Sequence, residues 1–361
     1  MGLCDVTDAD VRLPPGTAAL ALQLAASAAD AAAALTGQPH AVDRDAVLAH
    51  LLMPLVVGTR PPPRPARPAP GGGWVHDDTG DADAALLAAL VAEGDDAEGL
   101  AARAQACFLP VTPYRAWSWP AASSASDAFP ASAPARRLDP AGVRVVDMTA
   151  MWSGPLCTLL LAEWGAQVTT VEPAVRPDGL RGAPAQFAVL DRGKRRVDLD
   201  LRTTAGRSAF EALVAGADVL VESFSGRVMP NLGYSTGELR SINPRLVTVA
   251  IRAFPDSDWV AYGRGVHAAS GLGMHAGRPQ PAQIAYPDPL TGLAAFASVL
   301  HALGAADAPP STTVTLAGTI APLLAGGARP LSPGDPTVVA RLARATAGAT
   351  AAPIRRAATE P

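Results

Sequence analysis

Asp288 is the residue in this sequence whose surroundings are best suited to chemistry. It lies between two prolines in IAYPDPLTG, just before an apolar helix predicted over 291–303. A carboxylate at a rigid helix start is a suitable nucleophile or general base, and the helix dipole favours its ionised form. Aspartate is also a common helix N-cap, which is a purely structural role. The local sequence leaves both roles open.

A cluster of cations is the second candidate. In LDRGKRRVDLDL, four cations surround a glycine at the start of a predicted strand: Arg192, Lys194, Arg195 and Arg196. Such a turn could hold the phosphates of a nucleotide-like ligand. The structural alternative is a solvated basic turn, balanced by the nearby acids Asp191, Asp198 and Asp200.

The third candidate is the turn TAMWSGP, which follows a predicted strand at 143–148 and opens a helix at Gly154. Ligands of doubly wound sheets bind at the carboxyl ends of strands, beside helix N-termini. The turn has a single glycine and is not GxGxxG, so it gives little support to a nicotinamide dinucleotide site. An ordinary connection between strand and helix is the alternative.

Alternating strands and helices position these candidates. Apolar runs predict strands at 143–148, 168–172, 197–201, 218–222 and 246–251, with helices at 154–164, 202–217 and 291–303. Ser235 and Glu238 match a capping box before a further short helix. The spacing predicts an α/β fold with a Rossmann-like, mostly parallel sheet, preceded by a helical and mixed N-terminal domain.

Two Pro-rich composition breaks suggest the domain organisation. We expect an N-terminal domain at 1–118 that contains a Pro-rich linker at 59–73. A second linker at 119–140 would lead to the large domain at 141–327, and a flexible tail would follow at 328–361.

Composition narrows the functional classes. The 361 residues include 29 basic and 33 acidic ones, so neither nucleic acid nor a membrane surface is expected as a partner. Three widely spaced cysteines without CxxC argue against a disulfide framework or zinc site, and no metal site is expected. The apolar stretch at 13–29 begins with two prolines and a glycine and predicts an amphipathic or buried helix, so a cytoplasmic protein is expected.

Together the motifs resemble one family. Over about residues 141–303 the sequence is similar to family III CoA-transferases, the group of formyl-CoA transferase, L-carnitine dehydratase and α-methylacyl-CoA racemase. The matching stretches, in order, are GVRVVDMTAMWSGPLCTLLLAEWGAQVTTVEP, VLDRGKRRVDLDLRTTAGR, ADVLVESF with NLGY, INPRLVTVAI and DPLTGLAAFASVLHAL. The resemblance implies transfer of CoA between an acyl-CoA thioester and a carboxylic acid. Coenzyme A would then be part of the substrate, with no cofactor permanently bound.

The resemblance also implies roles for single residues. The family's covalent aspartate falls on Asp288, whose carboxylate would attack the thioester to give a mixed anhydride and then an aspartyl-CoA thioester. The implied CoA contacts fall on three segments: Trp152 and Ser153; Leu190, Asp191, Arg192, Gly193 and Lys194; and Ser223 and Phe224, where the family has Asn-Phe. An interlocked homodimer is implied as well.

Departures from the family pattern keep alternatives open. Asn231 replaces a frequent arginine, VAYGRGVHAASGLG lacks a GYD- or GHD-like motif, and only 73 residues follow Asp288. The family's usual downstream small domain is therefore not expected here, so either the N-terminal segment supplies it or the site is incomplete. Racemases of the family pair a histidine with the aspartate, and His267 and His275 are the nearest candidates. A racemase or isomerase with Asp288 as proton base, and a CoA-binding homologue without turnover, are the alternatives.

Overall fold

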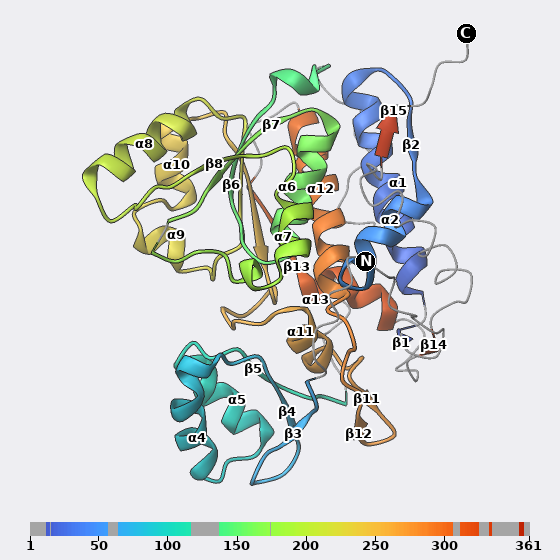
Figure 1. The fold of residues 1–361 in the computed structure, drawn as a ribbon, viewed down its shortest axis with the longest axis vertical. Coiled ribbons are helices and arrows are strands. Elements are labelled where there is room, and N and C mark those ends of the chain that lie inside the picture. Colours follow the sequence, from blue (N-terminus) through green and yellow to red (C-terminus); the bar gives the residue numbers. More distant parts are fainter. Residues whose placement is uncertain are drawn as a thin grey trace.

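The computed structural model describes residues 12–14, 16–56, 64–116, 137–173, 175–305, 311–324, 332–333 and 354–356. Its centre is a six-stranded sheet in the order β13-β10-β9-β6-β7-β8, with every neighbouring pair parallel (Figure 1). The strands are β6 Arg144–Met148, β7 Gln167–Val171, β8 Arg195–Val197, β9 Val219–Glu222, β10 Val247–Arg252 and β13 Ser311–Thr315. Numbered along the chain, this is the order 3-2-1-4-5-6 of Rossmann folds. The predicted α/β class is confirmed.

Helices cover both faces of the sheet, which explains why its strands are apolar runs. Val145 and Val219 share one core with α6 (Ser153–Trp164) and α12 (Pro287–Gly304). Val146 and Leu220 share a second core with α8 (Thr204–Ala215) and α10 (Thr236–Ile242) on the other face. The capping box predicted for α10 is present. Two further helices, α7 (Pro184–Leu190) and α9 (Val228–Asn231), complete this part of the fold.

The third strand differs from its prediction. It was expected at 197–201, but β8 covers Arg195–Val197. Its partner β7 ends at Val171, which pairs with Val197, so the residues beyond 197 have no strand to pair with. Asp200 instead begins a turn, in which its carbonyl accepts a hydrogen bond from Thr203 N at 3.0 Å.

The first described helices belong to the core of the large sheet. They are α1 (Thr17–Thr36), α2 (Arg44–Leu51) and α3 (Met53–Val56). α1 packs along α12, and its residues Leu20, Leu24 and Leu35 join the same buried cluster. By length and composition, α1 is the one helix in the described ranges that could cross a membrane, and half of its apolar window is buried inside the protein.

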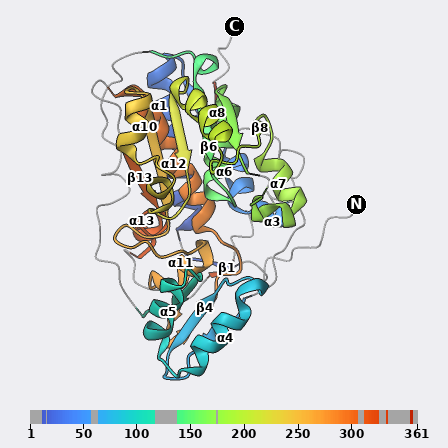
Figure 2. The same cartoon turned by 90° about the vertical axis from the view of Figure 1, so that its left-hand side faces the viewer.

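Residues 64–116 form a separate unit, the β3–β5 subdomain. It holds an antiparallel sheet of β3 (Arg67–Pro68), β4 (Trp74–Asp77) and β5 (Val111–Pro113), covered by α4 (Ala84–Ala92) and α5 (Ala97–Ala106). It has its own small core, and both views show it next to α11 (Gly263–Ala269) (Figure 1 and Figure 2). The region expected as one N-terminal domain thus has two cores, and β3 falls inside the expected linker at 59–73.

Short pairings complete the described chain. β1 (Arg12–Leu13) pairs with β14 (Ser332–Pro333), and β2 (His40–Val42) pairs with β15 (Ile354–Arg356). β11 (Met274–His275) and β12 (Arg278–Pro279) form a hairpin, and α13 (Leu316–Ile320) follows β13. Most of the expected linker at 119–140 and of the expected tail at 328–361 lies outside the described residues.

Candidate functional site

Asp288 lies where the N-terminal ends of three helices meet. It belongs to the first turn of α12 and is 8% exposed. Its Oδ1 accepts a hydrogen bond from Ser153 Oγ at the start of α6, at 3.1 Å. Its Oδ2 accepts one from Gly263 N at the start of α11, also at 3.1 Å. Each carboxylate oxygen is therefore held by a different helix.

This arrangement shows that Asp288 is not the N-cap of α12. The N-cap of α12 is Tyr286, and no side chain caps the helix there. The carboxylate instead reaches across to α11, where a Cβ on Gly263 would lie 2.3 Å from Asp288 Oδ2. Glycine is required at this position because the carboxylate approaches the backbone so closely.

Burial sets the protonation of Asp288. It raises the pKa of the carboxyl from 3.8 to about 7, against the hydrogen bonds from Ser153 and Gly263, which lower it. The charge of Asp78 raises this pKa further, and that of Arg264 lowers it. A carboxyl that is partly ionised at neutral pH suits a nucleophile as well as a base.

Replacing Asp288 with asparagine is expected to change how stability depends on pH. The folded chain keeps the proton up to about pH 7, whereas the unfolded chain loses it near 3.8, so unfolding becomes easier as pH rises between these values. Above pH 7 the wild type should therefore have lost about 4 kcal/mol of unfolding free energy, a loss that the asparagine variant should not show. Urea denaturation of both proteins between pH 4.5 and about pH 8 measures it.

The difference between the two proteins isolates Asp288 from other buried groups. Burial lowers the pKa of His50 and of His267 to about 4, so these histidines stabilise the fold as pH rises towards 6.5. Their contribution is common to both proteins and cancels. A stability difference that stays constant across the pH range would show that Asp288 has an ordinary pKa.

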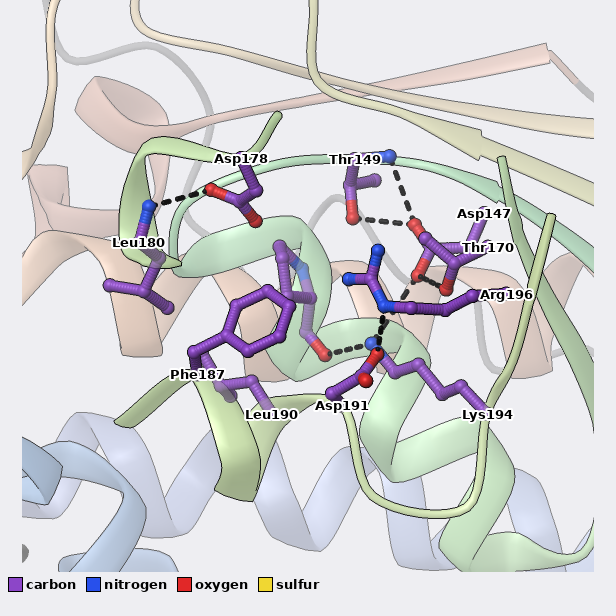
Figure 3. A pocket seen from close by; sticks show the side chains of 11 residues that line it. Asp147, Thr149, Thr170, Asp178, Leu180, Phe187, Leu190, Asp191, Lys194 and Arg196 are labelled. Atoms are coloured by element: carbon purple, nitrogen blue, oxygen red, sulfur yellow. Dashed lines mark hydrogen bonds and ion pairs between the residues drawn. The ribbon is translucent and has the colours of Figure 1, made fainter. Parts of the chain in front are cut away.

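A small cavity lies at the carboxyl ends of β6 and β7, next to the first turn of α6 (Figure 3). Three of the predicted CoA contacts, Leu190, Asp191 and Lys194, line it, whereas Arg192 and Gly193 do not. The other lining residues are Asp147, Thr149, Pro155, Thr170, Asp178, Leu180, Phe187 and Arg196. Sequence reasoning gave no role to Asp178 or Phe187, which come from outside the basic turn.

Lys194 is buried beneath this cavity. Its side chain is 2% exposed. Its ammonium donates to Thr158 Oγ1 at 2.7 Å. It also donates to Pro155 O at 2.9 Å and to Asp147 Oδ2 at 3.3 Å (Figure 3). Burial lowers the pKa of Lys194, and the charge of Asp147 opposes this effect. The three protons of the ammonium thus all have partners within the fold.

The other cations of the turn have different surroundings. Arg192 pairs with Glu163 of α6. Arg196 pairs with Glu172 and with Asp191, the latter at 2.7 Å. Arg195 is exposed. The alternative of a solvated basic turn therefore describes Arg195, but not Lys194.

The remaining predicted contacts lie between β6 and β9, where the strand order reverses. Trp152 and Ser153 begin α6, and Ser223 follows β9 directly, where its Oγ accepts a hydrogen bond from Ala150 N at 3.1 Å. Phe224 N donates to Glu222 Oε2 at 2.8 Å. Trp152 is 6% exposed, and its Nε1 has no hydrogen-bond partner among the described residues. The turn between β6 and α6 thus lies between the cavity on one side and Ser223 after β9 on the other.

In the described part of the chain, neither histidine forms a hydrogen bond with Asp288. His267 is fully buried, with Nδ1 2.9 Å from Tyr286 Oη and Nε2 2.8 Å from Gln280 O. Both ring nitrogens are engaged, so His267 is unavailable as a second base. His275 lies in the β11–β12 hairpin.

The β3–β5 subdomain docks on α11, the helix whose Gly263 amide donates a hydrogen bond to Asp288. Thr112 Oγ1 donates to Gly265 O at 3.0 Å, and Arg115 N donates to Ala268 O at 3.2 Å. Gln105 makes two hydrogen bonds with the backbone of Val260, at 2.8 and 2.7 Å. The N-terminal half of the chain therefore reaches the surroundings of Asp288 through α11.

Comparison with known proteins finds relatives of the part of the chain that contains the large sheet. Residues 141–315 match the family model described as CoA-transferase family III. Formyl-CoA:oxalate CoA-transferase of Rhodopseudomonas palustris (strain HaA2) is 33% identical over 177 residues, which are 45% of this chain and 42% of the relative. The beta subunit of succinyl-CoA–L-malate CoA-transferase of Chloroflexus aurantiacus is 33% identical over 180 residues, 45% of this chain and 44% of the relative.

Two solved structures are similar to about half of the chain. A hypothetical protein of Mycobacterium tuberculosis is 29% identical, with a TM-score of 0.49 and coverage of 54% of this chain and 58% of that one. A CAIB/BAIF family protein of Brucella suis is 28% identical, with a TM-score of 0.47 and coverage of 51% and 55%. The chain spans less than half the length of the two curated relatives described above.

Proposed function

Because residues 141–315 belong to CoA-transferase family III, we propose that this chain transfers CoA between an acyl-CoA thioester and a carboxylic acid through a covalent intermediate on Asp288. The observation that carries the proposal is the Asp288 carboxylate itself. It is buried, fixed by Ser153 and Gly263, and has a pKa of about 7. A nucleophile held in one orientation and ionised near neutral pH is what this chemistry needs.

The proposed reaction exchanges acyl and thiolate groups on one carboxylate. Asp288 attacks the thioester carbonyl carbon and the C–S bond breaks. CoA leaves as a thiolate, and a mixed anhydride between the acyl group and Asp288 remains. The thiolate then attacks the aspartyl carbonyl, which releases the donor acid and leaves an aspartyl-CoA thioester. The acceptor carboxylate repeats these steps in reverse, so that CoA ends on the acceptor and Asp288 is regenerated. Covalent catalysis thereby divides one difficult transfer into easier steps.

We further propose that CoA lies along the turn after β6. The cavity of Figure 3 and the reversal point between β6 and β9 lie on either side of the start of α6. Doubly wound sheets bind nucleotide-like ligands at this position. Residues 152–153 and 223–224 border this path, and so do Leu190 and Asp191 of the predicted contacts at 190–194. Lys194 would support the turn from beneath.

Mass analysis of CoA products tests the function directly. The chain is incubated in deuterated water with formyl-CoA and oxalate, and separately with succinyl-CoA and malate, the pairs named for its relatives. CoA on the new acid supports a transferase. Deuterium at the α-carbon of a longer acyl-CoA without CoA transfer would instead identify a racemase or isomerase. Neither product, with CoA still bound, would identify a binding homologue.

Replacing Gly263 with alanine is expected to lower turnover far more than CoA binding. The new Cβ would lie 2.3 Å from Asp288 Oδ2 and must displace the carboxylate. A displaced nucleophile costs about a hundredfold in rate. Gly142→Ala is the matched control, because a Cβ there meets open space. Equal activity of the two variants would contradict the placement of Asp288.

The proposal includes a cytoplasmic homodimer as the working form, on the strength of the family resemblance. Light scattering at micromolar concentration tests this directly. A monomer that transfers CoA at full rate would contradict it.

A further inference from the structure

Asp178 holds the turn between β6 and α6 from outside that turn. It lines the cavity of Figure 3, and its Oδ1 accepts hydrogen bonds from Leu180 N at 2.9 Å and from Met151 N at 3.0 Å. The first bond caps the 3₁₀ helix η4 (Gly179–Gly182), which is an ordinary structural role. The second bond reaches the turn after β6, 27 residues earlier in the chain. Capping does not account for this second bond.

Met151 has a backbone conformation that its residue type does not favour. Its φ is 70°, in the left-handed region, where a Cβ crowds the following carbonyl oxygen. Such a conformation persists where the neighbours hold it in place. The Asp178 carboxylate holds the Met151 amide, and a Cβ on Gly179 would lie 3.1 Å from Met151 Sδ. Residues 178–179 therefore contact both the backbone and the side chain of Met151.

The neighbouring amides of the turn also donate to side chains. Thr149 N donates to Asp147 Oδ1 at 2.9 Å, and Ala150 N donates to Ser223 Oγ at 3.1 Å. With Met151, three successive amides thus have acceptors that come from β6, from the segment after β9 and from the segment after β7. The turn is fixed from three directions.

Asp178 is itself anchored at the end of β7. Its backbone N donates to Glu172 Oε1 at 2.6 Å. Glu172 directly follows β7 and pairs with Arg181 and with Arg196 of β8. Asp178 is therefore attached to the edge of the sheet, and its carboxylate can act as a fixed support.

The turn that Asp178 supports leads directly to the candidate nucleophile. Ser153 is two residues after Met151, and its Oγ donates to Asp288 Oδ1 at 3.1 Å. A shift of the turn would move this hydroxyl and release one of the two hydrogen bonds that hold the carboxylate. The orientation of Asp288 thus depends on the conformation of Met151.

We propose that Asp178 is a positioning residue, which fixes the turn after β6 so that Ser153 can hold the Asp288 carboxylate. This inference rests on the proposed function, because the reactivity of Asp288 is what the arrangement would serve. Asp178 acts through the turn and needs no contact with the substrate.

The pKa of Asp288 tests the positioning without requiring turnover. The hydrogen bond from Ser153 lowers this pKa, so Asp178→Ala should raise it above its value of about 7. Loss of the negative charge of Asp178 would by itself lower the pKa of a nearby carboxyl, so the sign separates the two effects. Urea denaturation up to about pH 9, with and without Asp288→Asn in the same background, measures this pKa.

Two variants serve as controls. Asp178→Asn keeps an acceptor oxygen, so it should keep both hydrogen bonds and the pKa of Asp288. Asp139 caps the 3₁₀ helix η3 (Pro140–Gly142) by accepting a hydrogen bond from Ala141 N at 3.2 Å. Asp139→Ala therefore removes a cap of the same kind without affecting the turn, and should leave the pKa unchanged.

Variants of Met151 disturb the same contact from the other side. Valine is β-branched and fits poorly at positive φ, so Met151→Val should shift the turn and raise the pKa of Asp288 while the cap of η4 stays intact. Glycine adopts this conformation at no steric cost. Met151→Gly, added to Asp178→Ala, should therefore bring the pKa back towards about 7.

CoA transfer gives a second readout. At saturating acyl-CoA and neutral pH, Asp178→Ala should transfer CoA about tenfold more slowly than the wild type, the effect of losing one hydrogen bond to a charged group. Asp139→Ala should transfer it at the full rate.

Each outcome decides between the proposals. If Asp178→Ala keeps a pKa of about 7 for Asp288, or if Asp178→Asn behaves like the alanine variant, the inference is wrong and the packing of α6 alone places Ser153. If Asp178→Ala does not fold, an unchanged pKa in Met151→Val has the same meaning. If the pKa rises as expected but the wild type transfers no CoA, the positioning role stands and the transferase activity fails. If Asp178→Ala transfers CoA at the full rate, the activity stands and the inference fails.

Discussion

Asp288→Asn is expected to abolish CoA transfer while the protein stays folded. An amide cannot attack the thioester to form an anhydride, so the rate should fall by at least about three orders of magnitude. The fold should survive, because asparagine has the same shape and a neutral group at this buried site avoids the desolvation cost of a carboxylate. The mass assay for CoA products measures the rate, and urea denaturation measures the fold.

The covalent role also predicts that an intermediate can be trapped on Asp288 of the wild type. Quenching with hydroxylamine or borohydride in the presence of acyl-CoA should leave a modification on Asp288. Asp200→Asn is the control, because that carboxylate pairs with Arg202 in a turn away from the site. Near-normal transfer by the Asp288 variant, or turnover by a wild type that is never labelled there, would refute the covalent role. If neither protein transfers CoA, the binding homologue becomes the better interpretation.

The sheet could be predicted because most of its strands are short apolar runs that can be identified locally in the sequence. Runs such as VRVVDM and DVLVE are apolar enough to identify strands buried on both faces, and helices of the right length separate them. The exception was the edge strand. Alternation in VDLDL continues past the point where β7 stops offering partners, so the pairing ended the strand earlier than the pattern did.

The contacts of the site could not be predicted in the same way. Ser153 and Gly263 meet Asp288 across 135 and 25 residues, and no spacing rule links them. Ser153 was expected to touch CoA, and its bond to Asp288 came from the crossing of α6 and α12. The segment around Gly263 lacks the family's GYD- or GHD-like motif, yet the backbone amide of Gly263 holds the Asp288 carboxylate. Almost every residue has a backbone N–H donor, so the sequence does not indicate which amide will hold a carboxylate.

The burial of Lys194 could not be predicted from the sequence either. In the sequence it is one of four cations around a glycine, and all four look equally suited to phosphates. In the fold its side chain passes under α6 to meet Asp147, 47 residues away. Burial is set by the packing of α6 over the turn and not by the residues next to Lys194.

Replacing Lys194 with methionine is therefore expected to cost stability more than any specific contact with CoA. Asp147 accepts hydrogen bonds from Thr149, Thr158 and Thr170, but Lys194 is the cation that balances its charge, and the two side chains are 2% and 1% exposed. Removing one member of a buried pair leaves an uncompensated charge and costs about 3–5 kcal/mol. Urea denaturation at neutral pH measures this loss.

The double variant Asp147→Asn/Lys194→Met separates the two roles of Lys194. It removes the buried charge together with its partner, so most of the lost stability should return. If Lys194 only supports the turn, the double variant should also regain CoA binding in calorimetry. If Lys194 contacts a phosphate, stability should return while CoA binding stays weak. Arg195→Met is the control in the same turn, because this exposed side chain should lose little stability. An unchanged unfolding free energy in the Lys194 variant would show that the ammonium leaves its buried position, and would favour the phosphate contact.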